Sequence, residues 1–211
     1  WGPLNEMYRA SQHAQATTSH LLSFSRKQIL QPQKTDLNEL LGHLHHAASR
    51  LIGEDIRLSV ITAPQLRPVL VDKASMHQAM MNLVINARDA MPQGGDLVLR
   101  TANLDLGPEG SAQFAAALPG PYVLLEVRDT GIGMDAETLA HVFDPFFTTK
   151  GIGKGTGLGL AMVLGFVEQS HGFLAVESRS GQGTVFRVLL PALTSASPVP
   201  DPALRSPVEA S

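Results

Sequence analysis

The sequence DTGIGMDAETLAHVFDPFFTTKGIGKGTGLGL, residues 129–160, decides how the rest of this chain is interpreted. It opens on an aspartate followed by a Gly-x-Gly turn, and it closes with glycine at every second position, at Gly151, Gly153, Gly155, Gly157 and Gly159. Glycines at that density fill no core volume and lose much backbone entropy on folding. They suit a backbone that passes close to a ligand, and a glycine run that leads into a helix N-terminus presents N–H groups to an anion. The stretch therefore predicts a nucleotide site.

Composition limits the classes of protein to which the chain can belong. With 44% hydrophobic and 17% charged residues, it has the make-up of a folded soluble protein. The net charge of −3 argues against nucleic acid or an anionic membrane as the main partner. The absence of cysteine excludes disulfides and thiolate metal sites, and it fits a reducing compartment. No membrane-spanning apolar run or signal peptide is visible, so we expect a cytoplasmic location. The chain starts at Trp1 and is interpreted as a fragment, of a protein that could carry a sensor or a membrane anchor upstream.

The N-terminal part of the chain predicts a long helix from Pro3 to about Gln28. Its small and apolar residues follow a heptad spacing: Met7, Ala10, Ala14, Thr17, Leu21 and Phe24. One narrow stripe needs a partner helix, so we favour helical-bundle association, and with it a homodimer, over packing on the chain's own domain. The heptad pattern ends at Gln31-Pro32-Gln33-Lys34, because the residue before a proline disfavours helical backbone angles. We interpret this stretch as a hinge or domain boundary.

Helices and strands are interleaved in the middle of the chain. Helices are expected from the caps Asp36 and Asp72 to Ile52 and Met91, and a third over 158–170. The expected strands are 56–61, 69–71, 96–104, 122–127, 173–178 and 184–190. Together they predict an α/β (α+β) two-layer sandwich, with one mixed sheet of about five strands covered on one face by helices. The expected domains are a helix and hinge over 1–33, this sandwich over 34–192, and a disordered Pro/Ala/Ser tail over 193–211.

Two asparagines stand out on the second expected helix. Asn82 and Asn86 are four residues apart and share one face, while Leu83, Val84 and Ala87 turn toward the sheet. A buried amide must find hydrogen-bond partners, so the pair is unusual for a core helix. A surface amide pair is the plain alternative. The glycine-rich stretch downstream favours a shared ligand site instead.

Four blocks, in this order, resemble the N, G1, F and G2 boxes of the ATP-binding domain of histidine kinases, within the wider GHKL superfamily. The matching text is NLVINARDA at 82–90, DTGIG at 129–133, FDPFFTTK at 143–150 and GTGLGL at 155–160. The resemblance covers about residues 36–192, and it extends weakly over 1–30 as the second helix of a dimerisation and phosphotransfer hairpin. It implies the GHKL ATP-binding fold, with ATP and Mg²⁺ as cofactors.

The resemblance assigns the purine end of a nucleotide site to the G1 block. Asp129 accepts the exocyclic N–H of adenine, and Thr184 supports that aspartate, often through water. Gly131 and Gly133 let the backbone pass close to the purine, and Met134 could cover its face. Guanine carries a carbonyl at the same edge, so a carboxylate acceptor there selects adenine.

The phosphate end is assigned in the same way. Asn86 offers an amide oxygen to Mg²⁺, and Asn82 contacts the phosphate side. Lys150, with Arg88 or Lys154 as further candidates, supplies positive charge. The glycine run closes over the phosphates. The full set of expected nucleotide-binding residues is Asn82, Asn86, Arg88, Asp89, Asp129, Gly131, Gly133, Met134, Lys150, Gly155, Thr156, Gly157, Leu158, Gly159 and Thr184.

One position separates kinases from ATPases in this superfamily. Hydrolytic members carry a glutamate four residues before the metal-binding asparagine. In this chain that position is occupied by Asn82, whose amide cannot act as a general base. The resemblance therefore implies an ATP:protein-histidine phosphotransferase of a two-component system, with a response regulator as its next partner. No histidine here is followed by an acidic residue, so the phosphoacceptor is expected outside this chain. A GHKL ATPase or serine-type protein kinase, and a non-catalytic ATP-binding dimerisation module, are the alternatives.

Overall fold

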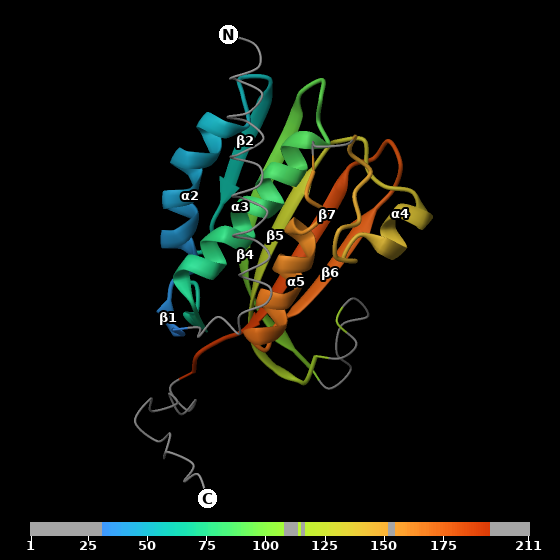
Figure 1. Ribbon diagram of the computed structural model, residues 1–211. Coiled ribbons are helices and arrows are strands. Elements are labelled where there is room, and N and C mark those ends of the chain that lie inside the picture. The colour runs from blue at the N-terminus through green and yellow to red at the C-terminus, as the bar shows by residue number, and fades with distance from the viewer. Residues whose placement is uncertain (1–30, 108–113, 115–116, 152–154, 195–211) are drawn as a thin grey trace, which may run out of the picture.

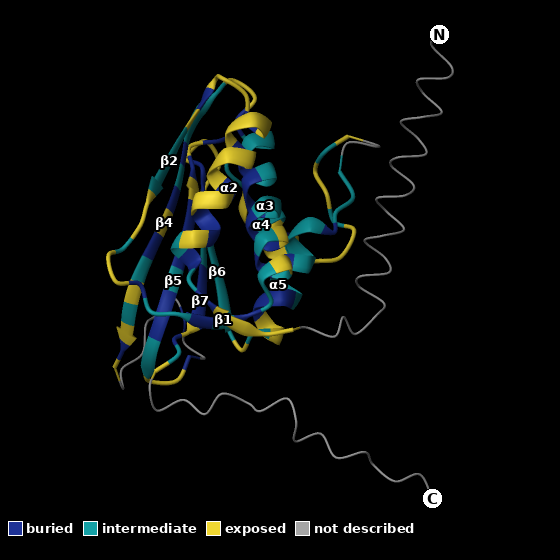
Figure 2. Cartoon of the chain, turned by 90° about the vertical axis from the view of Figure 1, so that its left-hand side faces the viewer, coloured by how far each residue is buried: buried dark blue, intermediate teal, exposed yellow. Residues whose placement is uncertain are grey.

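The computed structural model describes residues 31–107, 114, 117–151 and 155–194. The expected N-terminal helix and most of the expected tail therefore lie outside the described residues. What is described forms two layers, a twisted sheet and a layer of helices on one of its faces (Figure 1; Figure 2). The sheet has five strands in the order β2, β4, β5, β7, β6, namely Ile56–Ile61, Gly95–Leu106, Gly120–Asp129, Thr184–Pro191 and Phe173–Ser178. Only the β2–β4 pair is parallel, so the sheet is mixed, as predicted.

Three long helices cover the sheet: α2 (Leu37–Leu51), α3 (Lys73–Asp89) and α5 (Gly159–Gln169). Asp36 and Asp72 cap the first two, because their carboxylates accept the backbone N–H groups of Asn38 and Ser75, each at 2.8 Å. Helix α5 begins differently, after Leu158, which makes no side-chain cap. The N–H groups of its first turn are therefore not satisfied by the cap residue.

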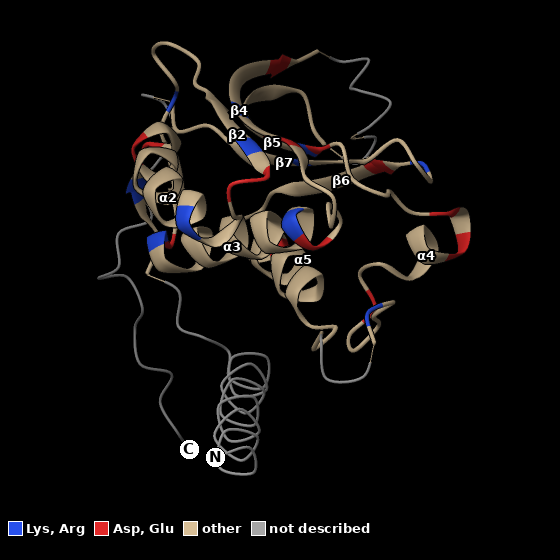
Figure 3. Ribbon diagram, turned by 90° about the horizontal axis from the view of Figure 1, so that it is seen from above, with Lys and Arg blue, Asp and Glu red and all other residues tan. Residues whose placement is uncertain are grey.

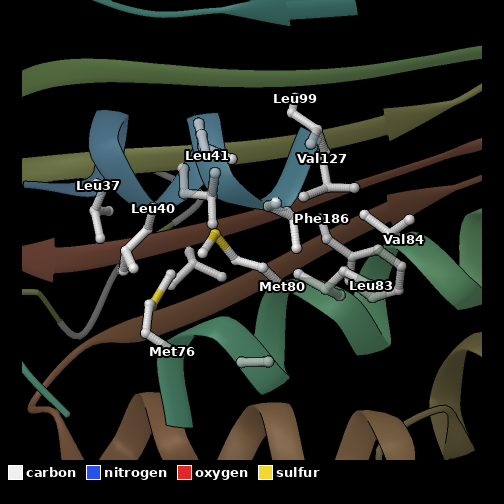
Figure 4. Packing of buried hydrophobic residues seen from close by; sticks show 14 of the residues in the cluster. Leu37, Leu40, Leu41, Met76, Met80, Leu83, Val84, Leu99, Val127 and Phe186 are labelled. Atoms are coloured by element: carbon white, nitrogen blue, oxygen red, sulfur yellow. The ribbon is translucent and has the colours of Figure 1, made fainter. Parts of the chain in front are cut away.

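The main core lies between α2, α3 and the sheet (Figure 4). On α3, Met76, Met80, Leu83 and Val84 are each at most 1% exposed. They pack between two further groups of buried side chains, Leu37, Leu40 and Leu41 of α2 and Leu99, Val127 and Phe186 of the sheet. Burial of this face fixes the rotation of α3 about its own axis, and so fixes where its polar residues point.

Two short elements differ from the sequence prediction at the start of the domain. Gln33–Thr35, expected as part of a hinge, forms β1, which pairs antiparallel with β3 (Val69–Val71) in a separate two-stranded sheet. The prediction that 69–71 joins the main sheet was therefore wrong. The proline at residue 32 favours extended backbone, which is equally a strand, and three residues are too few to show alternation. The backbone N–H of Gln31 also donates to the Asp72 carboxylate at 3.1 Å.

A further helix, α4 (Ala136–His141), was not expected. Asp135 caps it by accepting the N–H of Thr138 at 2.8 Å, yet it buries no residue, so its sequence carries no amphipathic period. It projects beside the β6 edge, away from α2 (Figure 3).

Strand β5 also runs further than predicted and ends on Asp129, which pairs with Thr184 of β7. This register brings together two residues that are far apart in the sequence. Within the described ranges, no helix is long and apolar enough to cross a membrane.

Candidate functional site

A cavity of about 450 Å³ lies between α3, the end of β5 and the segment that leads into α5. Its walls contain most of the residues expected to bind a nucleotide: Asn82, Asn86, Asp89, Asp129, Gly133, Met134, Lys150, Gly155, Thr156, Gly157, Gly159 and Thr184. Two of them, Asn86 and Asp129, come from different layers of the fold and face the same space. The juxtaposition on which the sequence interpretation depends is therefore present.

Three of the expected residues do not line the cavity. Arg88 turns away toward α2, where Nη1 lies 3.4 Å from the carbonyl oxygen of Leu51. Gly131 is buried behind the wall, and Leu158 is 1% exposed and belongs to the core. All three lie inside motifs whose spacing is clear, but spacing does not show which side of a turn or helix faces a ligand. Lys154 lies outside the described residues.

One end of the cavity is built around Asp129, which is 4% exposed. Its Oδ1 accepts the backbone N–H groups of Gly131 at 2.8 Å and Thr184 at 3.2 Å. Among the described residues, no group donates to its Oδ2. Burial raises the pKa of Asp129, and the two N–H groups offset this only in part. This end therefore presents one unused acceptor oxygen of a largely buried carboxylate.

The loop that follows Asp129 is pinned by a residue that the sequence motifs did not indicate. The Ser178 hydroxyl accepts the N–H of Met134 at 2.9 Å, donates to the carbonyl of Gly183 at 3.0 Å and lies 2.9 Å from the Thr184 hydroxyl. Gly133 has φ +63, and a Cβ at this position would collide with the carbonyl of Arg179. The Met134 side chain is thus held against the cavity by a fixed backbone. Only the register of β6 against β7 brings Ser178 here, which explains why it was missed.

The other end of the cavity is polar and lies along α3. Asn82, Asn86 and Asp89 occupy its uncovered face, and the Asn82 amide donates to the Gly159 carbonyl at the start of α5, at 3.2 Å. Across from them, Lys150 Nζ lies 2.6 Å from Asp89 Oδ2 and 3.4 Å from Asn86 Oδ1. The Lys150 ammonium therefore lies close to Asn86 Oδ1, the amide oxygen that was expected to bind a metal.

Asp89 has a charged environment, unlike Asp129. Arg88 donates to its Oδ1 from Nε at 2.9 Å and from Nη2 at 2.6 Å, and Lys150 holds Oδ2. Partial burial raises the pKa of Asp89, but the hydrogen bonds and charges of Lys150 and Arg88 outweigh this, so that the pKa is lowered. Asp89 is therefore a carboxylate at neutral pH, with both oxygens engaged.

The segment between the two ends is fastened by backbone contacts. The N–H of Phe146 donates to the carbonyl of Gly157 at 2.9 Å, and both residues have positive φ, +69 and +66. A side chain at Gly157 would collide with the Phe146 backbone, so glycine is required there. This contact joins the aromatic block to Gly157, two residues before α5, beside the cavity.

The remaining wall is largely apolar, and it was not assigned from the sequence. Its apolar residues include Ile85, Val142, Leu160, Met162 and Phe186, and Thr138, Thr148 and Thr149 also line it. Val142 directly follows the unexpected helix α4, Ile85 and Leu160 lie inside two of the four sequence blocks, and Met162 and Phe186 lie beyond the last block. An apolar slot that ends in one carboxylate at Asp129, with amides and a lysine at its far end, fits a flat polar-edged ring joined to an anionic chain.

Comparison with known proteins agrees with this geometry. Residues 71–194 match the family model described as "Histidine kinase-, DNA gyrase B-, and HSP90-like ATPase". The chain is 43% identical over 180 residues to "Sensor kinase CckA" of Brucella abortus, covering 85% of this chain and 19% of that protein. It is 34% identical over 190 residues to "Sensor histidine kinase ZraS" of Klebsiella oxytoca, covering 88% of this chain and 37% of that protein. The chain thus spans only a minor part of these relatives.

A solved structure supports the fold. The catalytic domain of histidine kinase ThkA aligns with a TM-score of 0.62 at 26% identity, over 77% of this chain and 97% of that one. The mixed sheet with helices on one face, expected from the sequence, is therefore the arrangement found in histidine kinase catalytic domains.

Proposed function

The chain belongs to the family of histidine kinase-, DNA gyrase B- and HSP90-like ATPases, and from that premise we propose that it is the ATP-binding catalytic region of a sensor histidine kinase. It binds Mg·ATP and passes the γ-phosphoryl group to a histidine outside this chain. The P–O bond between the γ-phosphorus and the oxygen that bridges to the β-phosphate breaks, a P–N bond to the imidazole forms, the imidazole releases its N–H proton, and ADP leaves. An aspartate of a response regulator is the next acceptor.

The observation that carries this proposal is the state of Asp129. A buried carboxylate with one oxygen held by two backbone N–H groups keeps its other oxygen free to accept a hydrogen bond. Adenine offers an N–H donor at its 6-position, whereas guanine offers a carbonyl oxygen, which a carboxylate repels. Charge-assisted hydrogen bonds are the strong ones, so this single group supplies base selectivity. Gly133 and Met134 bound the same end of the slot.

The far end of the cavity suits the phosphates and their metal. Mg²⁺ prefers oxygen ligands and keeps several waters while it bridges phosphate oxygens, which one amide oxygen from Asn86 allows. Among the described residues of the cavity wall, Lys150 is the cation, and it is placed to reach phosphate oxygens. The glycines before α5 and the uncapped first turn of that helix add backbone N–H donors on the same side.

Transfer is favoured over hydrolysis by what the cavity wall lacks. Among the described residues that line it, Asp89 and Asp129 are the carboxylates, and no histidine is present. Asp129 lies at the purine end, and both oxygens of Asp89 are engaged by Lys150 and Arg88. Neither is free to activate water beside the γ-phosphate. The site therefore holds ATP until another nucleophile arrives.

The protein context of this region is proposed on the same grounds. The heptad pattern before residue 30 supports dimerisation through a helical hairpin, whose partner helix carries the phosphoacceptor histidine. ATP and response regulators are cytoplasmic, so we place this region in the cytoplasm.

The test has two stages. Calorimetry with ATP and GTP, each with and without Mg²⁺, should show ATP binding that Mg²⁺ tightens and little heat from GTP. Labelled ATP is then mixed with the chain and an added phosphoacceptor hairpin domain, where acid-labile label should appear on the hairpin. Tight ATP binding without labelling would refute the kinase proposal. Steady phosphate release without an acceptor would favour a GHKL ATPase instead.

A further inference from the structure

The Lys150 ammonium is held by α3, the helix that carries the proposed metal ligand. It bridges Asp89 Oδ2 at 2.6 Å and Asn86 Oδ1 at 3.4 Å. The two acceptors are three residues apart on α3, so they lie about one turn apart on one face. A single cation contacts both, and this face of α3 also lines the cavity.

An ammonium and Mg²⁺ compete for this place. Both seek oxygen ligands, and a charge of +1 and a charge of +2 repel each other strongly when they share an acceptor. If Asn86 Oδ1 binds the metal that accompanies ATP, then Lys150 has to leave that oxygen when the metal arrives. The exchange adds positive charge at the phosphate end and frees the lysine for a phosphate oxygen.

We propose that Asn86 and Asp89 together form a divalent-cation site, which the Lys150 ammonium fills before nucleotide binds and gives up to Mg²⁺ when ATP enters. The inference rests on the proposed function and deepens it, because it assigns Asp89 to the metal, directly or through a bound water. Asp89 contributes the negative charge that Asn86 lacks, and a carboxylate is the usual protein ligand of Mg²⁺.

Two observations support the exchange. Arg88 holds the other oxygen of Asp89 with two hydrogen bonds from outside the cavity wall, which keeps Oδ2 directed toward Asn86 whether or not Lys150 stays. The Lys150 side chain is 33% exposed and its next neighbour is Gly151, around whose Cβ position nothing lies within 4 Å. The lysine therefore has room to move.

The experiment titrates Mn²⁺, as a spectroscopic substitute for Mg²⁺, into the nucleotide-free chain and follows free Mn²⁺ by electron paramagnetic resonance. Lys150→Met should tighten Mn²⁺ binding by about fivefold or more, because a competing cation is removed. Adding Asp89→Asn to that variant should abolish the gain. Arg88→Met is the matched control: it removes a cation from the same carboxylate but leaves Asn86 covered by Lys150, so it should tighten Mn²⁺ far less.

Two results would overturn the inference: no gain in Lys150→Met, or a gain that survives Asp89→Asn. Circular dichroism checks that each variant folds, and Lys150→Gln serves as a second neutral variant if the methionine disturbs the loop. The outcome is separable from the proposed function. If the chain binds Mg·ATP but Lys150→Met shows no tighter Mn²⁺ binding, the exchange is refuted and the proposed function stands. If the chain binds no adenine nucleotide, the proposed function itself is refuted.

Discussion

The two ends of the cavity each contain an aspartate, and the two carboxylates are held in opposite ways. Asp129 is buried, contacts only neutral backbone N–H groups through one oxygen, and has a raised pKa. Asp89 is partly exposed, is bound by two cations, and has a lowered pKa. The difference supports the proposal that one end reads a hydrogen-bonding edge, while the other balances the charge of a metal and phosphates. A fixed, buried acceptor suits a base, and exchangeable ion pairs suit a metal and phosphates.

The largest expected effect comes from Asp129→Asn, which replaces the unused Oδ2 acceptor of Asp129 with an NH₂ donor. The amide keeps an oxygen for Gly131 and Thr184 but turns an N–H toward the adenine amino group. ATP affinity should fall by about 10- to 150-fold, the worth of one charge-assisted hydrogen bond. Because ITP carries a 6-oxo group, its affinity should rise in the same variant. Calorimetry with both nucleotides decides this, and an unchanged preference would mean that Asp129 does not read the base.

A pair of glycines tests whether the purine end is the rigid one. Gly133→Ala forces a side chain into a left-handed backbone position against the Arg179 carbonyl, and it should cost about 2 kcal/mol or more of unfolding free energy. Gly151→Ala, beside Lys150, meets open space and should leave stability within about 0.5 kcal/mol. Urea unfolding of both variants gives the comparison. Equal losses would show that the two ends do not differ in rigidity.

Lys150→Met tests the charge at the phosphate end. ATP affinity should fall by about threefold to tenfold, since the lysine is partly exposed and its attraction for phosphate is screened. AMP carries no β- or γ-phosphate, so its affinity should hardly change. The ATP loss should also shrink as salt is raised. An equal loss for ATP and AMP would place Lys150 at the base or in the structure of the loop instead.

The smallest expected effect is a pH-dependent stability difference at Asp129. Because burial raises its pKa in the folded state, the folded protein binds more protons than the unfolded chain between the two pKa values. The wild type therefore loses stability as pH rises through that window. Asp129→Asn removes the ionisation, so its unfolding midpoint should exceed that of the wild type at pH 7 and converge on it as pH falls below the ordinary aspartate range. A gain that grows at low pH would contradict the raised pKa.

Most of the fold and the amide-bearing and charged residues of the cavity wall could be predicted from the sequence, because both leave periodic or punctuated patterns. Capped helices, alternating strands and paired glycines each have a local physical cause. The missed elements lack such a cause: β1 is too short to alternate, and α4 buries nothing. The role of Ser178 depends on strand register. The ion pair between Lys150 and Asp89 joins residues 61 positions apart, so it depends on the path by which a loop returns to α3. Arg88 points away from the cavity because of the rotation of α3 about its axis.

The small sheet of β1 and β3 has a mechanical consequence. Strand β3 runs directly into Asp72, the cap of α3, and the backbone N–H of Gln31 donates to the same carboxylate. The chain at Gln31 is thus linked by one hydrogen bond to the residue from which α3 starts. A displacement delivered from that side would act directly on the N-terminal end of α3, the helix that carries Asn82 and Asn86.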